Sequence, residues 1–272
     1  MAQANPPRSR ALGGKVPGTA AFSKFMSVLQ LVADDPGQLT LTQLYKKTTF
    51  PRGTTHRIVS ALIQEGLIAE DLRTECLELG PRLMTLASQA WDRFDLRLIA
   101  REDIRALRDA TGETVHLAVP SGLEMVYVDK LESLQAVSMR SRIGTRIKLH
   151  STSVGKAYLA ALEPSERDAL LKAIDYRPAT PHTILTRREL ERDLKETAER
   201  GYSIDREETE LDIICFGCAI RGAAGKPVGC LSITIPKYRL TEAVAAACRD
   251  GIMDCARRIS ARIVTVPGQD AF

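Results

Sequence analysis

Apolar residues recur every three to four positions in three short segments near the amino end of the chain. This spacing predicts helices over about 22–33, 41–47 and 51–64, because it gathers the apolar side chains on one face of each helix. Two short strand-like runs follow at 67–71 and 76–80, and they predict a small hairpin. The order of elements in this part of the chain is therefore three helices and a hairpin.

Beyond residue 80 helices and strands alternate. A long helical segment over 81–112 comes first, and we expect the boundary between two domains within it, near Arg93. The strand candidates that follow are 114–119, 124–131, 136–140, 202–207, 213–221 and 228–235. The helix candidates are 153–162, 164–174, 187–200 and 240–263. Glycine turns between the strand candidates predict hairpins, so we expect an α+β fold whose antiparallel sheet is flanked by helices.

Composition and charge are ordinary for a globular protein. The 272 residues are 44% hydrophobic and 26% charged, and the formal net charge of +4 is too small to identify a nucleic-acid partner by itself. No apolar run reaches the roughly 20 residues of a membrane helix, and the amino end lacks the apolar segment of a signal peptide. We expect a cytoplasmic protein with no membrane partner and six reduced cysteines. Residues 1–20 predict a disordered basic arm, and 266–272 predict a loose tail.

The predicted helix over 51–64 has a polar face in addition to the apolar face that packs in a core. Projected at about 100° per residue, it gathers Thr55, Ile58, Val59, Leu62 and Ile63 on an inward face. Gly53, Arg57, Ser60 and Gln64 fall on the opposite face, flanked by His56. No Asp or Glu occurs from residue 36 to 64, so this face is small and cationic, which suits a DNA major groove. With the hairpin it predicts a winged helix-turn-helix, although a three-helix interaction module with a solvated basic face fits the same pattern.

Two polar segments in the second half have the composition of a ligand site. The Ser/Thr-rich stretch 151–153 leads into a predicted helix, whose free backbone N–H groups favour a carboxylate or phosphate. The alternative is that Thr152 or Ser153 only caps that helix. Ser232 and Thr234 share one face of a predicted strand, where they line either a pocket or the solvent side of the sheet.

The cysteines raise two rival functions. Cys215 is a candidate nucleophile with His116, His150 or His182 as its base, but no local catalytic signature supports an enzyme. Cys215 and Cys218 have the C-x-x-C spacing of zinc and redox sites. Residues three apart in a strand face opposite sides, so a strand at this position separates the two thiols. We expect neither catalysis nor a bound metal, and a zinc- or redox-dependent protein is the alternative from a different class.

Several stretches, taken in order along about 21–263, match a known pattern. They begin with "TLTQLYKKTTFPRGTTHRIVSALIQEGLIAED" and "LELGPRLMTLA". "GETVHLAV", "VYVDKLES", "SRIGTRIKLHSTSVGKAYLA", "GYSIDREE" and "LTEAVAAACRDGIMDCARRISARI" follow. Together they resemble the DNA-binding half and the effector-binding domain of the IclR family of bacterial transcriptional regulators. The resemblance implies a winged helix-turn-helix domain at 21–80, linker helices at 81–110 and a GAF-like effector-binding domain at 95–265.

The resemblance also implies a function and its residues. Arg52, Thr54 and Arg57 occupy positions that usually touch DNA in the family, and the cationic surface adds Lys46, Lys47, Gly53, His56 and Ser60 as candidates. Ile147, Ser153, Val154, Asp205, Cys215, Ser232 and Thr234 match positions that contact small carboxylate effectors. The implied protein represses a catabolic operon in response to a small organic or aromatic acid, with an activator of the same type as the alternative. Its partners are operator DNA, the acid and further copies of the chain in a homodimer or dimer of dimers, and no cofactor is expected.

Overall fold

The computed structural model describes residues 18–91, 96–135, 141–222 and 225–265. Residues 1–17 of the expected arm, the expected boundary near Arg93, the strand candidate at 136–140 and the tail at 266–272 lie outside the described residues. The chain forms two compact units, Met1–Asp95 and Leu96–Phe272. Helices and antiparallel sheets occur in both, which confirms the α+β class. None of the described helices combines the length and apolarity needed to cross a bilayer.

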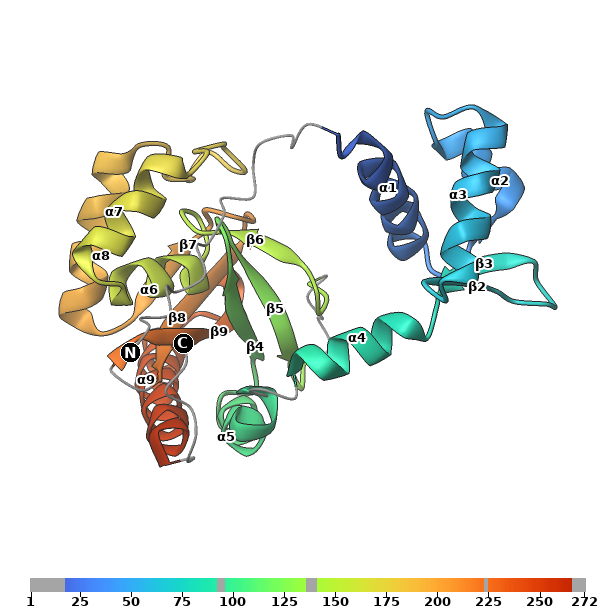
Figure 1. Ribbon diagram of the computed structural model, residues 1–272. Helices are drawn as coiled ribbons and strands as arrows, with labels where there is room; N and C mark the ends of the chain where they lie inside the picture. The colour runs from blue at the N-terminus through green and yellow to red at the C-terminus, as the bar shows by residue number, and fades with distance from the viewer. Residues whose placement is uncertain (1–17, 92–95, 136–140, 223–224, 266–272) are drawn as a thin grey trace, which may run out of the picture. The chain divides into compact units, whose positions relative to one another are not determined.

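The amino-terminal unit is a set of three helices followed by a hairpin (Figure 1). Its helices are α1 Ala20–Asp34, α2 Leu41–Lys47 and α3 Arg52–Gln64, with α4 Arg82–Trp91 after the hairpin. Its strands are β1 Leu39–Thr40, β2 Ile68–Glu70 and β3 Cys76–Leu79, in the order β1-β3-β2. The winged helix-turn-helix prediction is confirmed, and only β1 was missed, because two residues carry no periodicity.

The three helices enclose a small apolar core. Val28, Val32, Leu44, Ile58 and Leu62 are at most 3% exposed. One residue predicted to face inward does not: Ile63 is 38% exposed. At about 100° per residue it lies at the edge of the stripe formed by Ile58 and Leu62, where the helix turns away from the core. The inward prediction for Ile63 was wrong.

The carboxyl-terminal unit is built on a six-stranded antiparallel sheet. Its strands are β4 Thr114–Ser121, β5 Glu124–Leu131, β6 Arg146–Lys148, β7 Ser203–Arg206, β8 Ile213–Arg221 and β9 Pro227–Pro236. Their order across the sheet is β6-β5-β4-β9-β8-β7, so β4 and β9 are neighbours although four strands separate them in sequence. The predicted strands that fall on described residues are present with ends within two residues, and β6 was not predicted.

Helices cover both faces of this sheet (Figure 1). The first layer consists of α5 Leu96–Thr111 and α9 Glu242–Thr265, which pack against each other. The second layer consists of α6 Ser153–Ala161, α7 Pro164–Ala173 and α8 Arg187–Arg200. A short turn, η2 Lys237–Arg239, leads from β9 to α9. Since both faces are covered, neither side of the central strands is a solvent side.

Candidate functional site

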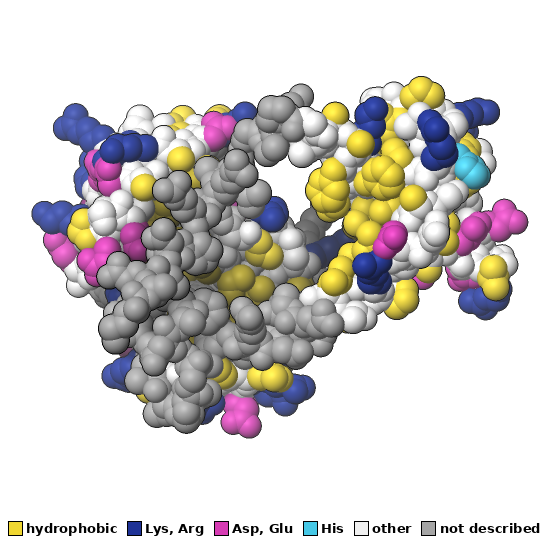
Figure 2. All heavy atoms as spheres, in the orientation of Figure 1, with side chains coloured by type: hydrophobic (Ala, Val, Ile, Leu, Met, Phe, Trp, Pro, Cys, Tyr) yellow, Lys and Arg dark blue, Asp and Glu magenta, His cyan; other side chains and the backbone are white. Residues whose placement is uncertain are grey.

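The outward surface of α3 carries the cations predicted to meet DNA. Arg52, Gly53, His56, Arg57 and Ser60 are exposed, and Thr54 is half-buried. Arg57 makes no side-chain hydrogen bond or ion pair within the described part of the chain, so its guanidinium is available to an outside partner. Figure 2 shows dark blue cationic side chains on the part of this unit that carries α2 and α3.

The amino end of α3 is open. No side chain caps the helix at Pro51, so the N–H groups of Arg52 and Gly53 have no capping partner. A Cβ added to Gly53 would meet nothing within 4 Å. On the buried side of the helix, Thr55 Oγ1 lies 3.1 Å from Thr48 Oγ1, which ties α3 to the end of α2. A rigidly held helix with a free amino end attracts anions such as a DNA phosphate.

The two lysines of α2 differ in their surroundings. Both are exposed, but Lys47 forms an ion pair with Asp35 that offsets part of its charge within the unit. The Arg52 guanidinium lies 5.9 Å from the ring centroid of Tyr45, and this cation–π contact limits its freedom. Sequence reasoning missed Tyr45, although it directly precedes the two lysines.

In the carboxyl-terminal unit, the hydroxyls of β9 face a histidine rather than solvent. Ser232 and Thr234 are 1% and 3% exposed, which excludes the solvent-side alternative. His116 on β4 is in register with Ser232, and its Nδ1 lies 3.4 Å from Ser232 Oγ and 3.5 Å from Thr234 Oγ1. Cys215 on β8 is in register with Thr234, and its Sγ lies 3.4 Å from the Thr234 hydroxyl. These four residues form one polar area, here named the sheet patch.

Three further residues adjoin the sheet patch, and sequence reasoning missed them as site residues. His116 Nε2 lies 2.7 Å from Ser141 Oγ, and its ring stacks on Tyr127 with centroids 4.4 Å apart. Lys130 Nζ donates to the Ser141 carbonyl at 2.9 Å, and the lysine side chain is only 8% exposed. An extra residue in β5, Val128, makes a bulge that brings Tyr127 and Lys130 to the same face.

The predicted effector residue Asp205 lies beside the sheet patch. It is 4% exposed, and on β7 it is in register with Cys215. Its Oδ1 accepts a hydrogen bond from the Glu208 N–H at 2.7 Å. Ile147 on β6 is half-buried against the same apolar core as Val154, on the side of the sheet that α6 covers. Segments far apart in sequence thus meet on one sheet face.

Burial determines the charge states in this area. Burial, with Lys130 nearby, lowers the pKa of His116 to about 3, so the imidazole is neutral at physiological pH. Burial, followed by repulsion from Glu208, raises the pKa of Asp205 to about 7. Burial also raises the pKa of the Cys215 thiol well above its usual range. At neutral pH this face therefore presents mainly uncharged hydrogen-bonding groups and one carboxyl that is partly protonated.

The start of α6 lies directly on β8. A Cβ on Gly217 would come within 2.6 Å of the Ser153 carbonyl, and Ser203 Oγ donates to that carbonyl oxygen at 2.6 Å. Thr152 caps the helix by accepting a hydrogen bond from its first turn at 3.1 Å, so the capping alternative holds for Thr152. Ser153 and Val154 follow in the first turn and are 3% and 1% exposed.

The cysteines do not form a C-x-x-C site. Cys215 Sγ contacts Thr234, whereas Cys218 Sγ lies 3.6 Å from the Gly201 carbonyl on the other face of β8. Burial raises the pKa of Cys218 to about 11, which is the opposite of what a reactive thiolate needs. Within the described ranges, no three His, Cys, Asp or Glu side chains are grouped to hold a metal ion.

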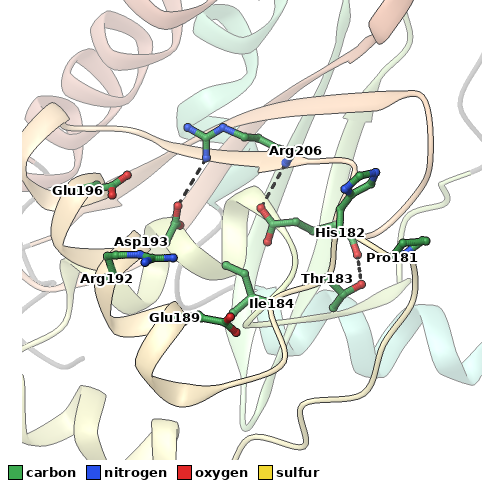
Figure 3. A pocket seen from close by; sticks show the side chains of 10 residues that line it. Pro181, His182, Thr183, Ile184, Glu189, Arg192, Asp193, Glu196 and Arg206 are labelled. Carbon is green, nitrogen blue, oxygen red and sulfur yellow. Dashed lines mark hydrogen bonds and ion pairs between the residues drawn. The ribbon is translucent and has the colours of Figure 1, made fainter.

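Behind Asp205, a buried lysine joins two carboxylates. Lys156 on α6 is fully buried, with Nζ 2.5 Å from Glu208 Oε1 and 3.1 Å from Asp193 Oδ2. Both carboxylates line a hollow of about 470 Å³, in which Arg206 pairs with Asp193 at 3.7 Å (Figure 3). Because the Glu208 N–H bonds to Asp205, Lys156 ties α6 and α8 to the turn that orients Asp205.

Comparison with known proteins decides the family. Residues 22–72 match the IclR helix-turn-helix domain, and residues 88–261 match the domain described as bacterial transcriptional regulator IclR C-terminal. The chain belongs to the IclR family. It is a DNA-binding transcriptional regulator, as the resemblance implied.

Individual relatives cover nearly the whole of this IclR-family regulator. The transcriptional repressor IclR of Escherichia coli (strain K12) is 28% identical over 224 residues, which is 82% of each protein. The Thermotoga maritima IclR crystal structure matches with a TM-score of 0.75 and 31% identity, over 89% of this chain and 98% of that chain. An IclR homologue from Microbacterium hydrocarbonoxydans, solved in complex with 4-hydroxybenzoate, has a TM-score of 0.74 and 23% identity over 89% and 100% of the two chains. The Escherichia coli repressor is similar in sequence and the Thermotoga maritima protein in sequence and fold, whereas the Microbacterium homologue shows the fold alone.

Proposed function

We propose that this IclR-family regulator is a repressor, and that a small organic or aromatic acid bound at the sheet patch changes its affinity for the operator. The observation that carries the proposal is the sheet patch itself, where residues of β4, β8 and β9 meet Asp205 of β7. Repression is supported by the name of the Escherichia coli relative, the transcriptional repressor IclR. Because an operator lies on the chromosome, we expect the protein to act in the cytoplasm.

The groups around the sheet patch suit a carboxylic acid with a flat body. The β9 hydroxyls donate hydrogen bonds to a carboxylate oxygen, and so does Asp205 in its protonated form. Lys130, at the edge of the patch, adds a cationic side chain. The stacked rings of His116 and Tyr127 offer an aromatic wall against which a planar ligand packs. The 4-hydroxybenzoate bound by the Microbacterium homologue is an acid of this kind.

On the DNA side, α3 enters the major groove. The exposed Arg57 then faces base edges, where a guanidinium makes two parallel hydrogen bonds to guanine O6 and N7. The open amino end at Gly53 approaches a phosphate, and Arg52, supported by Tyr45, lies beside the backbone. The absence of acidic residues from 36 to 64 leaves nothing on this surface to repel the duplex.

We infer that the regulator works as a homodimer or a dimer of dimers, since an operator with two half-sites needs two α3 helices at a fixed spacing. Apolar side chains on the amino-terminal unit support this inference: Phe22, Met26, Met84 and Leu86 are between 46% and 71% exposed. Figure 2 shows an apolar yellow area over α1, and such areas mark association surfaces. An acid that binds one arrangement of the subunits better shifts the population toward it.

Gel shifts with the full-length protein test the DNA part of the proposal. On the DNA upstream of its own gene, the protein should bind far more tightly than on random duplex at the same salt concentration. Arg57→Ala should weaken specific binding by about 1–3 kcal/mol, or roughly 5- to 150-fold. Arg188→Ala, an exposed arginine of the other unit, is the control and should bind like the wild type. Equal affinity for operator and random DNA would refute the proposal.

A thermal-shift screen of metabolite acids tests the effector part. An acid that binds the folded protein raises its melting temperature, and the same acid should change operator affinity in the gel shift. Thr234→Val keeps the shape of the side chain but removes its hydroxyl, so this variant should lose most of both responses. If Thr234→Val and Ser232→Ala respond fully to the acid, the effector binds elsewhere.

A further inference from the structure

A second hollow, of about 340 Å³, lies between α5 and β5 on the sheet face opposite the sheet patch. It is lined by Arg97, Leu98, Arg101, Ile104, Arg105, Asp129 and Leu131. We propose that this hollow, here named the α5 hollow, is a second ligand site that takes an organic dianion, namely two carboxylates on a compact apolar body. Its volume lies at the lower end of the range of small-molecule sites. This site is separate from the one in the proposed function.

Two arginines of the α5 hollow, Arg101 and Arg105, form no ion pair with a described residue. They provide two guanidiniums at the hollow, and Asp129 provides a carboxylate with which neither of them pairs. Arg101 and Arg105 are exposed and make no side-chain hydrogen bond or ion pair with any described residue. By contrast, Arg258 of the neighbouring helix α9 lies 2.9 Å from the Asp103 carboxylate. An anion in the hollow would therefore form charge-assisted hydrogen bonds that the protein itself does not supply.

The floor of the α5 hollow is apolar. Ile104 is 1% exposed and Leu131 is half-buried, while Leu98 is 68% exposed beside the arginines. A simple inorganic anion gains no binding energy from these apolar side chains, because it interacts only with the guanidiniums. A ligand with a hydrocarbon body also covers Leu98 and removes its apolar surface from water. The apolar side chains of the floor and the arginines beside them together favour an amphipathic anion.

The spacing of the arginines favours two carboxylates. Arg101 and Arg105 are four residues apart along α5, so they stand on one side of the helix about 6 Å apart in rise. Each guanidinium matches the geometry of one carboxylate. A rigid aromatic spacer holds two carboxylates apart, one for each of these two arginines, whereas a monocarboxylate meets only one of them.

The strand β5 separates the α5 hollow from the sheet patch. Asp129 is in register with Leu117 and points to the α5 side, while Lys130 is in register with His116 and reaches the sheet patch. The two areas therefore use alternate residues of the same strand, and neither shares a lining residue with the other. Variants in one can be made without touching the other.

Isothermal titration of the full-length protein with 1,3-benzenedicarboxylate tests the proposal. We expect binding to the wild type and to Thr234→Val, whose sheet patch is altered. The double variant R101Q/R105Q should bind at least tenfold more weakly, whereas the control R188Q, which removes an exposed arginine of α8, should not change. Benzoate and inorganic sulfate are the comparison ligands, and both should bind more weakly than the dicarboxylate.

Four outcomes would overturn the assignment. Unchanged binding by R101Q/R105Q would show that these arginines do not bind the dicarboxylate. Sulfate binding as tight as that of the dicarboxylate would remove the apolar floor from the site. A change in the solution mass of R101Q/R105Q, measured by light scattering, would make the hollow a contact between subunits. Loss of binding in Thr234→Val alone would assign the dicarboxylate to the sheet patch, which would leave the proposed function intact while refuting this site.

Discussion

The imidazole of His116 stacks on the phenol ring of Tyr127, with centroids 4.4 Å apart and planes inclined by 25°. The hydroxyls of Ser232 and Thr234 lie near Nδ1, and that of Ser141 lies 2.7 Å from Nε2. A neutral imidazole needs one donor and one acceptor partner, and a hydroxyl serves as either. The surroundings of His116 therefore favour its neutral form, in the area where we expect the effector.

The first prediction concerns the effect of low pH on the stability that His116 contributes to the folded protein. The folded pKa of His116, about 3, lies below the ordinary value of 6.5, so unfolding takes up a proton between these pH values. This contribution to stability is complete above about pH 6.5 and is lost as the pH falls toward 3, by up to about 1.4 kcal/mol per pH unit. His116→Asn does not titrate, so its free energy of unfolding should lack that slope. Urea denaturation at several pH values measures it, and an unchanged slope would mean that the folded histidine is protonated.

The second prediction concerns Asp205, whose effect on the pH dependence of stability has the opposite sign. Its folded pKa of about 7 lies above the ordinary 3.8, so the folded state keeps a proton that the unfolded state releases. Stability from this group is complete below about pH 3.8 and is lost as the pH rises to about 7. Asp205→Asn removes this loss, so between about pH 4 and 6.5 its unfolding free energy should rise more steeply with pH than that of the wild type.

The same denaturation series provides the control. The double variant His116→Asn/Asp205→Asn should show neither contribution, because the two groups titrate in opposite directions over the overlapping range. If the Asp205→Asn curve runs parallel to the wild-type curve, the carboxyl is ionised in the folded protein, and it cannot donate a hydrogen bond to an acid at neutral pH.

Strand alternation was enough to predict that Ser232 and Thr234 share a face of β9, but it left open what covers that face. The answer depends on α6, whose first turn lies against Gly217 of the neighbouring strand. That contact joins residues about 60 positions apart, and no local pattern reports it. The sequence therefore predicted the strands of the sheet well, but it did not predict how completely the site residues are buried.

The partners of the β9 hydroxyls could not be predicted, for a more specific reason. His116 meets Ser232 only because β4 and β9 are neighbours, and that pairing is set by the whole fold. Tyr127 and Lys130 are three residues apart, which assigns them to opposite faces of a regular strand. The bulge in β5 brings both to one face, and no turn residue in the sequence marks it. The family resemblance predicted which residues contact the effector, whereas the bulge determines which additional side chains lie beside them.

The third prediction uses Gly53 to probe the DNA surface without disturbing the fold. A Cβ there meets nothing within 4 Å, so Gly53→Ala should leave stability unchanged or raise it by about 0.5–1 kcal/mol. The added methyl group would stand between the amino end of α3 and the DNA backbone. We expect operator affinity to fall on the order of tenfold, equivalent to about 1.4 kcal/mol. Gel shifts and thermal melts measured together check this, and full affinity would show that Gly53 does not approach the duplex.

The last prediction compares two lysines that differ in burial. Lys156 is fully buried between Glu208 and Asp193, so Lys156→Met leaves two buried carboxylates without their shared cation. Breaking a buried ion pair in this way costs about 3–5 kcal/mol. Lys172 pairs with Asp168 at 2.7 Å but is 67% exposed, so Lys172→Met should cost no more than about 1 kcal/mol. Urea denaturation of the two variants measures the difference directly.

The role of Lys156 also extends to the site, because Glu208 orients Asp205 through its backbone N–H. In Lys156→Met, Glu208 loses its cation, and the turn that carries both residues should loosen. The variant should therefore respond more weakly to any acid that shifts the wild-type melting temperature, even below its own unfolding transition. Lys172→Met should respond like the wild type. A destabilised Lys156→Met protein with a full acid response would show that the ion cluster supports the fold alone and does not position Asp205.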